Sequence, residues 1–326
     1  MTTTRWGIIG TGGIAANGAS AVHFLPDAEL VAVGSRSQES ADRFGNKWHI
    51  PHRHPSYEAL VHDLDVDAVY VATPHPFHQA HAMLALNAGK HVLLEKPLTI
   101  NAREAEELIR LARAKGLFLM EAMWTRFVPA NVKMWEMVRS GIIGDVHIVI
   151  ANQTFDLPYN LEGRLYHPDL AGGALLDLGV YPISYASWLL GKPSGIQSQA
   201  FKAVTGVDER NAVLLSYDSG ASALLTSTLR SPAPCEATII GPKGSIRIHH
   251  PFYCPAKLTI DRPGQASEHL EIPYEANGFH YDFAHLQECV AKGLTESPVM
   301  PLDESLQIMK TMDSIRAQWG LKYPME

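Results

Sequence analysis

A short apolar run that ends in glycines and leads into a helical stretch constrains the fold of this chain more than any other feature. The run Trp6–Ile9 is followed by Gly10-Thr11-Gly12-Gly13-Ile14-Ala15. Glycines in this pattern permit a tight turn and a close backbone approach, and a helix start offers N–H groups to a pyrophosphate. Dinucleotide binding is therefore expected at Gly10, Gly12, Gly13 and Ile14. An ordinary glycine-rich turn between a strand and a helix is the alternative.

The N-terminal third of the chain repeats this alternation of apolar runs and longer amphipathic stretches. Further runs lie at Leu30–Val33, Ala68–Ala72, His91–Leu94 and Leu117–Met120, with helical stretches at Ser37–Trp48 and Asn101–Lys115. Buried strands separated by helices predict an α/β domain with a parallel, doubly wound sheet, which we assign to residues 1–122.

The pattern changes after Ala122, and a chain of 326 residues is long enough for a second domain, residues 123–326. Its strand-like stretches with short turns predict an α+β domain with a large open, mostly antiparallel sheet. These stretches are Val146–Thr154, Ile196–Val204, Asn211–Tyr217, Ala221–Thr228, Ala237–Ile240, Ser245–His249 and Leu258–Ile260. We expect this domain to bind substrate and to dimerise, and its final helix could pack back on the first domain.

Composition excludes several classes of partner. The net charge is -7, and basic residues form no long run, so neither nucleic acid nor an anionic membrane is an expected partner. The three cysteines are far apart, which argues against a disulfide framework or a thiolate metal site. The apolar run begins too early to follow a signal peptide, so we expect a cytoplasmic protein.

The residues after the second apolar run bear on the choice of cofactor. NAD-specific folds usually place a carboxylate there to hold the adenosine ribose. This chain has Ser35-Arg36-Ser37 instead, which suits a ribose 2′-phosphate through charge-assisted hydrogen bonds. NADP is therefore expected rather than NAD, and a solvated turn arginine is the alternative.

Four further segments combine residue types that carry chemistry. They are Thr73-Pro74-His75-Pro76-Phe77-His78, Glu95-Lys96-Pro97, Glu121-Ala122-Met123-Trp124-Thr125-Arg126-Phe127 and the segment from Gly172 to Pro182. The first three come at strand ends, where ligands bind in open α/β sheets. We expect Thr73, Pro74, His78, Glu95, Lys96, Trp124 and Arg126 to contact the cofactor. The alternatives are that His78 only begins a helix and that Arg126 pairs with a carboxylate.

Together with the glycine loop, these motifs resemble the glucose–fructose oxidoreductase/inositol dehydrogenase (Gfo/Idh/MocA) family. The Trp-x-Arg-Phe motif and Tyr181 resemble its branch of dimeric dihydrodiol dehydrogenases and NADP-dependent D-xylose dehydrogenases. The resemblance implies a Rossmann domain, a second domain on an open sheet, catalysis in the cleft between them, and a homodimer. It also implies hydride transfer between nicotinamide and an aldose, a polyol or a cyclic trans-diol.

Carried over by position, Lys96 is similar to the family's active-site lysine, and Asp177 and Tyr181 resemble the branch's carboxylate and acid/base. Tyr181 stands where many relatives have histidine. A tyrosine pKa is about 10, so this role needs a cation nearby, which Lys96 could supply. On one helix Asp177 and Tyr181 would share a face, but Pro182 leaves their relative angle open. Structural alternatives are a turn lysine, a helix-capping aspartate and a core tyrosine.

Trp124, Phe155 and Phe279 are the aromatic candidates for contacts with substrate, and core packing is the alternative for Trp124. His75, His78 and His81 repeat every three residues and His52 and His54 precede them, but the sequence offers no acidic partner at suggestive spacing. We therefore expect no metal. Two other functions are compatible with this scaffold: a non-catalytic NADP-sensing protein and an NAD-dependent glycosidase.

Overall fold

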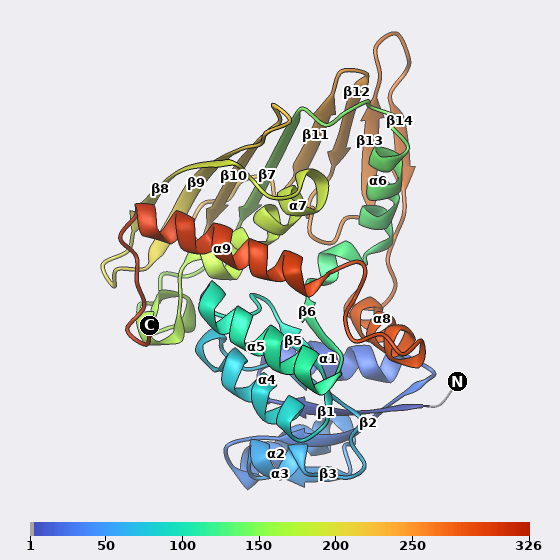
Figure 1. Cartoon of the computed structure of the whole chain (residues 1–326), viewed down its shortest axis with the longest axis vertical. Helices are drawn as coiled ribbons and strands as arrows, with labels where there is room; N and C mark the ends of the chain where they lie inside the picture. Colours follow the sequence, from blue (N-terminus) through green and yellow to red (C-terminus); the bar gives the residue numbers. More distant parts are fainter. Residues whose placement is uncertain (1–2) are drawn as a thin grey trace. The chain divides into compact units, whose positions relative to one another are not determined.

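A computed structural model describes residues 3–326, and these form two compact units (Figure 1). The first runs to Trp124 and adds Glu275–Leu306, and the second comprises Thr125–Tyr274 and Gln307–Glu326. The chain thus crosses over two residues later than the expected boundary at residue 122. Helix α8 (His280–Ala291), which we expected in the second domain, belongs to the first unit, as does the beginning of the final helix α9 (Leu302–Gln318).

Aromatic packing explains the placement of α8. The ring of Phe283 lies 4.7 Å from that of Trp6 and 5.0 Å from that of Tyr70, centroid to centroid. A Cβ added at Gly18 would collide with the Tyr70 ring, so the small residue lets α1 lie close to this cluster. Helical periodicity shows that α8 has an apolar face, but it does not show which core receives that face.

The first unit contains a six-stranded sheet in the order β3-β2-β1-β4-β5-β6, with all its recorded strand pairs parallel. This is the order of a doubly wound dinucleotide-binding sheet, so the expected fold class is confirmed. Its strands are β1 (Thr4–Ile9), β2 (Ala28–Gly34), β3 (His52–His54), β4 (Ala68–Val71), β5 (His91–Glu95) and β6 (Leu119–Ala122). Its helices before α8 are α1 (Gly13–Phe24), α2 (Gln38–Trp48), α3 (Tyr57–Val61), α4 (His78–Asn87) and α5 (Ala102–Lys115).

The strand register brings the candidate residues of this unit to one edge of the sheet. Ile9 pairs with both Gly34 and Val71, and Glu95 pairs with Ala122. Because parallel strands end on the same side, the segments that follow β1, β2, β4, β5 and β6 all leave from this carboxyl edge.

The second unit contains an eight-stranded sheet in the order β14-β13-β12-β11-β7-β10-β9-β8, in which β7 and β10 pair in parallel and the other recorded pairs are antiparallel. Its strands are β7 (Ile148–Thr154), β8 (Gly195–Lys202), β9 (Asp208–Ser216), β10 (Ser222–Thr228), β11 (Ala237–Gly241), β12 (Gly244–Ile248), β13 (Lys257–Asp261) and β14 (Glu268–Glu271). The expected open, mostly antiparallel sheet is thus confirmed.

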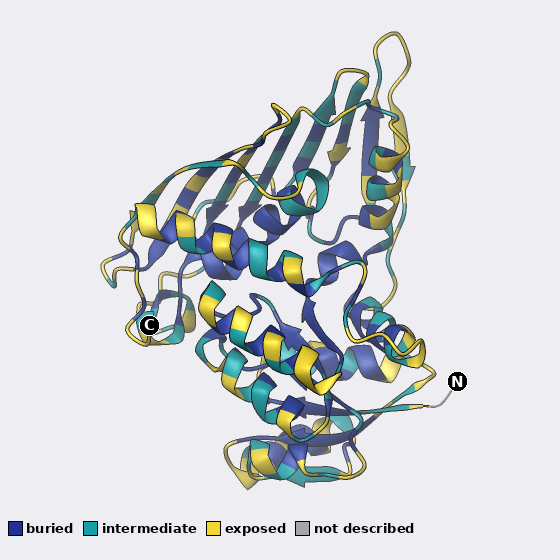
Figure 2. Cartoon of the chain, viewed as in Figure 1, coloured by how far each residue is buried: buried dark blue, intermediate teal, exposed yellow. Residues whose placement is uncertain are grey.

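Helices cover one face of this sheet: α7 (Val180–Leu190) contacts β7 and β10, and α6 (Pro129–Arg139) contacts β13. Along β9, buried and exposed residues alternate from Arg210 to Ser216, as Figure 2 shows. Such alternation is typical of a strand with one buried and one exposed face.

Candidate active site

The glycine loop after β1 has two kinds of glycine. Gly10 has a φ of +113°, and a Cβ there would lie 2.8 Å from the carbonyl oxygen of Ala72, so the protein itself requires this glycine. At Gly12 and Gly13 a Cβ would meet no atom within 4 Å, so the protein's packing does not require them. Helix α1 starts at Gly13 with Ile14 in its first turn, and no side chain caps its N-terminus. Open space beside uncapped N–H groups fits a pyrophosphate.

The segment after β2 presents one exposed cation. Ser35 is buried, with its Oγ 3.5 Å from Thr11 Oγ1, and Ser37 accepts the Ser40 N–H at 3.3 Å as the N-cap of α2. The Arg36 side chain is exposed. Burial raises the pKa of the Tyr57 phenol, and the positive charge of the nearby Arg36 offsets part of this increase. The guanidinium therefore lies at the carboxyl edge, where it suits an anionic group.

Lys96 is half-buried in the turn after β5, and buried side chains hold this turn on both sides. The Tyr70 hydroxyl donates to Glu95 Oε1 at 2.5 Å, and Glu95 Oε2 accepts the Lys96 N–H at 3.2 Å. Glu121 Oε1 accepts the Leu98 N–H at 2.9 Å. The sequence analysis gave no role to Tyr70, and it included Glu121 in a chemistry-bearing segment without assigning it one. Both residues lie in or beside apolar runs. A polar side chain there is expected to be buried and therefore to need a hydrogen-bond partner, and this expectation could have identified them.

His78 connects this turn to the one after β4. Its Nδ1 lies 2.8 Å from the carbonyl oxygen of Pro97, and its Nε2 lies 2.8 Å from that of Thr73. Burial lowers the pKa of His78 to about 3, and the electrostatic effect of His75 is the second largest cause of this decrease. Carbonyl oxygens only accept, so two donations would require a protonated ring. We take the ring as neutral, with one donated hydrogen bond, because burial, His75 and Lys96 all oppose a second proton.

Two other predicted residues lie on this side of the first unit. Thr73 Oγ1 lies 3.0 Å from His81 Nδ1, and Pro74 precedes the short 3-10 turn His75–Phe77 that leads into α4.

Trp124, which is 6% exposed, stacks on Phe279 with ring centroids 4.3 Å apart and an interplanar angle of 17°. The structure thus brings together two of the three aromatic residues expected at the substrate site.

In the second unit, Asp177 and Tyr181 occupy one continuous helical segment that changes its winding. Asp177 lies in a π-helical turn, Leu175–Gly179, and Tyr181 lies in the first turn of α7, directly before Pro182. Proline lacks the N–H that an α-helical ladder would use, and a single π turn is a form that recurs at functional sites. Asp177 also forms an ion pair with Arg164, at 3.0 Å.

Asp208 anchors the start of this segment, and sequence reasoning missed it. Gly173 has a φ of +117°, and a Cβ there would collide with the Asp208 carboxylate. Asp208 Oδ2 accepts hydrogen bonds from the Leu175 N–H at 2.8 Å and from the Asn211 side chain at 2.9 Å. Burial raises the pKa of Asp208 to about 7. Gly173 therefore lets the backbone approach this buried carboxyl, whereas Gly172 lies against the carbonyl oxygens of Arg164 and Leu165.

An aromatic cluster surrounds Tyr181. Its ring centroid lies 5.6 Å from that of Tyr253, which in turn lies 6.3 Å from that of Phe155. Burial raises the pKa of Tyr253 well above its ordinary value. The structure thus links the predicted acid/base with the predicted substrate contact Phe155, through a tyrosine that no motif identified.

Arg126 is 1% exposed, and its guanidinium donates to Ser184 Oγ at 2.9 Å and to the Ser184 carbonyl oxygen at 3.0 Å. These contacts hold the segment after β6 to helix α7 within the second unit. A contact of Arg126 with a cofactor stays a prediction.

Among residues 3–326, no helix has the length and apolar character needed to cross a membrane.

The sheet order, the open glycine loop and the lysine turn at the carboxyl edge define the first unit as a dinucleotide-binding domain of the Rossmann type. Residues 4–123 match the model of the oxidoreductase family with an NAD-binding Rossmann fold, GFO_IDH_MocA, and residues 131–247 match the GFO/IDH/MocA C-terminal domain. The chain belongs to the GFO/IDH/MocA family of oxidoreductases.

Relatives with similar sequences share one activity in their names. The chain is 37% identical over 333 residues to trans-1,2-dihydrobenzene-1,2-diol dehydrogenase of Macaca fascicularis, with 99% of this chain and 98% of the relative covered. It is 35% identical over 331 residues to the Homo sapiens enzyme of that name, with the same coverage.

Solved structures show the same two-unit fold. The 3-ketoreductase KijD10 of Actinomadura kijaniata, in complex with NADP and TDP-benzene, superposes with a TM-score of 0.86 at 30% identity, covering 97% of this chain and 98% of that one. An aldose-aldose oxidoreductase of Caulobacter crescentus, complexed with glycerol, gives a TM-score of 0.88 at 25% identity, with 98% of both chains covered.

Proposed function

We propose that this chain is an NADP-dependent dehydrogenase that transfers hydride between nicotinamide and a hydroxyl or carbonyl group of an aldose, a polyol or a cyclic trans-diol. The proposal depends on one observation: buried hydrogen bonds fix the turn that contains Lys96, and this turn lies at the same sheet edge as the open glycine loop. Relatives named as diol dehydrogenases, and similar structures of a ketoreductase and an aldose oxidoreductase, support this substrate class.

The cofactor would lie along the carboxyl edge of the six-stranded sheet. Gly10, Gly12, Gly13 and Ile14 would hold its pyrophosphate, and Ser35, Arg36 and Ser37 its ribose 2′-phosphate. We propose that its nicotinamide half contacts the following residues: Thr73, Pro74, His78, Glu95, Lys96, Trp124 and Arg126. When bound, the nicotinamide accepts or returns the hydride.

The chain itself would move the proton. Tyr181 would accept the substrate's hydroxyl proton during oxidation and return it during reduction. A phenol in a largely buried aromatic cluster needs a neighbouring cation to lose its proton near neutral pH. We propose that the ammonium of Lys96 supplies this charge and a hydrogen bond to the reacting oxygen, while Asp177, held by Arg164, orients the substrate's polar groups. Trp124, Phe155 and Phe279 would contact the substrate's carbon skeleton.

Measuring NADP reduction against a panel of aldoses, polyols and cyclic diols tests this function. Steady turnover with net oxidation of one class is the expected result. Cofactor binding without turnover on any of them would favour a sensing role, and hydrolysis of a glycoside without net oxidation would favour a glycosidase.

Replacing Arg36 with aspartate is expected to shift preference from NADP toward NAD. The change removes attraction for the 2′-phosphate, introduces repulsion, and gives the ribose hydroxyls an acceptor. A hydrogen bond to a charged group is worth about 1.5–3 kcal/mol, so the ratio of kcat/KM for the two cofactors should change by about 10–100-fold. Arg43→Asp is the matched control, because Arg43 is an exposed arginine on α2 whose charge pairs with Glu39. A wild type that already prefers NAD would refute the assignment of the cofactor.

We further propose a cytoplasmic homodimer formed through the helix-free face of the eight-stranded sheet. The support is an apolar row across three adjacent strands, in which Leu224 pairs with Leu214 on one side and with Ile150 on the other. Leu214 and Leu224 are 36% and 45% exposed. Obligate dimer interfaces bury roughly 2,000 Å² or more and are apolar.

Light scattering at micromolar concentration should therefore report twice the chain mass of 35.8 kDa. Leu224→Asp should reduce the mass toward that of one chain, because it places a charge in the centre of the apolar row. Leu294→Asp, at another exposed leucine outside this sheet, is the control and should leave the mass unchanged. A single-chain mass for the wild type would exclude the dimer.

A further inference from the structure

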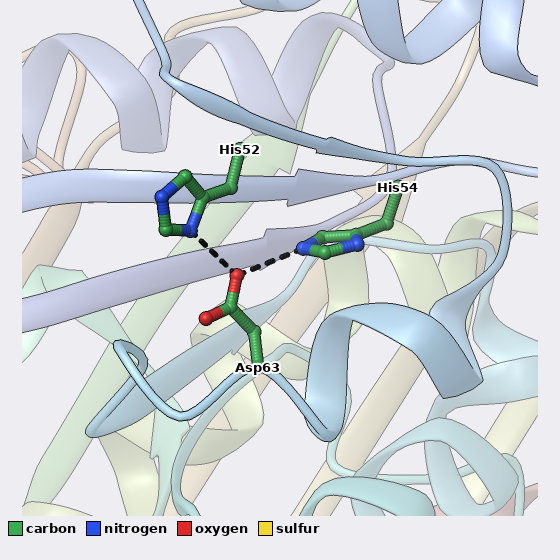
Figure 3. A group of neighbouring side chains, drawn as sticks. All are labelled: His52, His54 and Asp63. Carbon is green, nitrogen blue, oxygen red and sulfur yellow. Dashed lines mark hydrogen bonds and ion pairs between the residues drawn. The ribbon is translucent and has the colours of Figure 1, made fainter.

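A histidine–aspartate cluster in the first unit contains none of the residues assigned to the reaction, although the His54 carbonyl oxygen accepts the Ser35 N–H at 3.1 Å. Figure 3 shows the rings of His52 and His54 directed at the carboxylate of Asp63. His52 Nδ1 lies 2.7 Å and His54 Nε2 2.9 Å from Asp63 Oδ2. The donor atoms of the three residues all lie within 4.8 Å of one another.

Strand β3 and the turn after α3 bring these three side chains together. His52 and His54 alternate along β3, so both face the same side, while Arg53 between them donates to Asn46 and to the Ile50 carbonyl oxygen. Asp63 follows α3. Its main-chain oxygen accepts a hydrogen bond from Lys90 Nζ at 2.8 Å, which fixes the turn.

We propose that His52, His54 and Asp63 form a binding site for a divalent transition-metal ion of the zinc type. Two imidazole nitrogens and one carboxylate oxygen are ligands that such ions prefer, and three protein ligands leave a fourth position for water. In a tetrahedral site with bonds of about 2.0–2.1 Å, ligand atoms lie roughly 3.3 Å apart. The contacts to Asp63 Oδ2 would therefore lengthen by less than ~1 Å to admit an ion.

The charge and accessibility of the cluster suit a cation. Asp63 Oδ1 accepts the Asp65 N–H at 2.9 Å, which leaves Oδ2 to the two rings. Both imidazole rings therefore meet the same carboxylate oxygen. The Lys90 ammonium and the Arg5 guanidinium work against a bound cation, and Arg5 already forms ion pairs with Asp65 and Asp67. The side chains of His52 and His54 are 38% and 23% exposed, which gives an ion access.

A hydrogen-bonded triad that merely holds β3 in place is the competing interpretation, and a metal titration separates the two. The full chain, without an affinity tag, is freed of metal with a chelator and titrated calorimetrically with ZnCl2. We expect one equivalent to bind per chain and the melting temperature to rise by several degrees at saturation. Co2+ in the same site should give the visible absorption bands of a tetrahedral complex.

Variants assign the ion to these residues. His52→Gln, His54→Gln and Asp63→Asn should each lower Zn2+ affinity by at least about 10-fold and reduce the metal-dependent rise in melting temperature. His269→Gln is the matched control, because His269 and His249 both contact the Thr259 hydroxyl in a histidine pair without a carboxylate. It should leave Zn2+ binding unchanged.

Two results would overturn the proposal. One is the lack of stoichiometric binding to the wild type at Zn2+ concentrations well above that of the protein. The other is binding that survives all three cluster substitutions. A lower melting temperature of the variants in chelator reports only the structural role, so the metal-dependent difference is the deciding measurement. Neither result bears on the dehydrogenase activity, which needs no metal in our proposal.

Discussion

Tyr181→Phe is expected to lower turnover by about 10²–10⁴-fold while leaving the Kd for NADPH nearly unchanged. Phenylalanine keeps the ring that packs near Tyr253 but removes the hydroxyl that would carry the proton. Cofactor affinity should persist because the glycine loop and Arg36 belong to the other unit of the chain. NADPH fluorescence measures binding, and steady-state kinetics on the best substrate measures turnover.

Tyr253→Phe is the comparison that assigns the proton to one hydroxyl. It removes the same group from the neighbouring ring, whose pKa burial raises. If Tyr181→Phe keeps more than about a tenth of wild-type turnover, Tyr181 is not the acid/base. A large loss in Tyr253→Phe alone would transfer the role to Tyr253. With neither tyrosine responsible, a water bound by Lys96 would be the next candidate, because both ring nitrogens of the buried His78 face backbone carbonyl oxygens.

Lys96→Met should reduce turnover at least as much as the tyrosine substitution does. It removes the proposed donor to the reacting oxygen as well as the charge that favours the phenolate. Loss of a cation raises the pKa of a neighbouring phenol. Any residual oxidation should therefore increase with pH over a range shifted upward from that of the wild type. We also expect moderately weaker binding of NADPH, because Lys96 is a proposed nicotinamide contact.

Lys96→Arg is the conservative control for this prediction. Arginine keeps the charge but is larger and planar, so the pH profile should stay closer to that of the wild type than in Lys96→Met, even where kcat falls. The two variants should retain similar melting temperatures, because Tyr70, Glu121 and His78 hold the turn through groups other than the Lys96 side chain. A wild-type pH profile in Lys96→Met would contradict the proposed electrostatic role.

Local signals in the sequence predicted much of the fold. Strands buried on both faces appear as uninterrupted apolar runs such as Ala68–Val71, and one-faced strands alternate, as β9 does. Both patterns depend on neighbouring residues alone. Two strands lacked these signals: β3 has three partly exposed residues, and β14 contains Glu268, His269 and Glu271 among its four. They exist because an adjacent strand completes their backbone hydrogen bonds.

The motifs likewise identified residues at the carboxyl edge but not the groups that hold them. Lys96 stands in a recognisable tripeptide, whereas Tyr70 and Glu121, which support its turn, come from strands 26 positions before and 25 positions after it in the chain. Asp208 and Tyr253 were missed for the same reason, since each contacts the Asp177–Tyr181 segment from a distant part of the chain.

The sequence by itself determined the two sheets, the glycine loop and the residues with reactive side chains, because these depend on periodicity and on short motifs. Only the tertiary structure decided that α8 packs with the first unit, that a π turn precedes Pro182, and that Asp63 joins His52 and His54. The physical reason is common to all three. Each depends on contacts or backbone geometry set by packing between segments, and such packing leaves no periodic trace in the residues that take part.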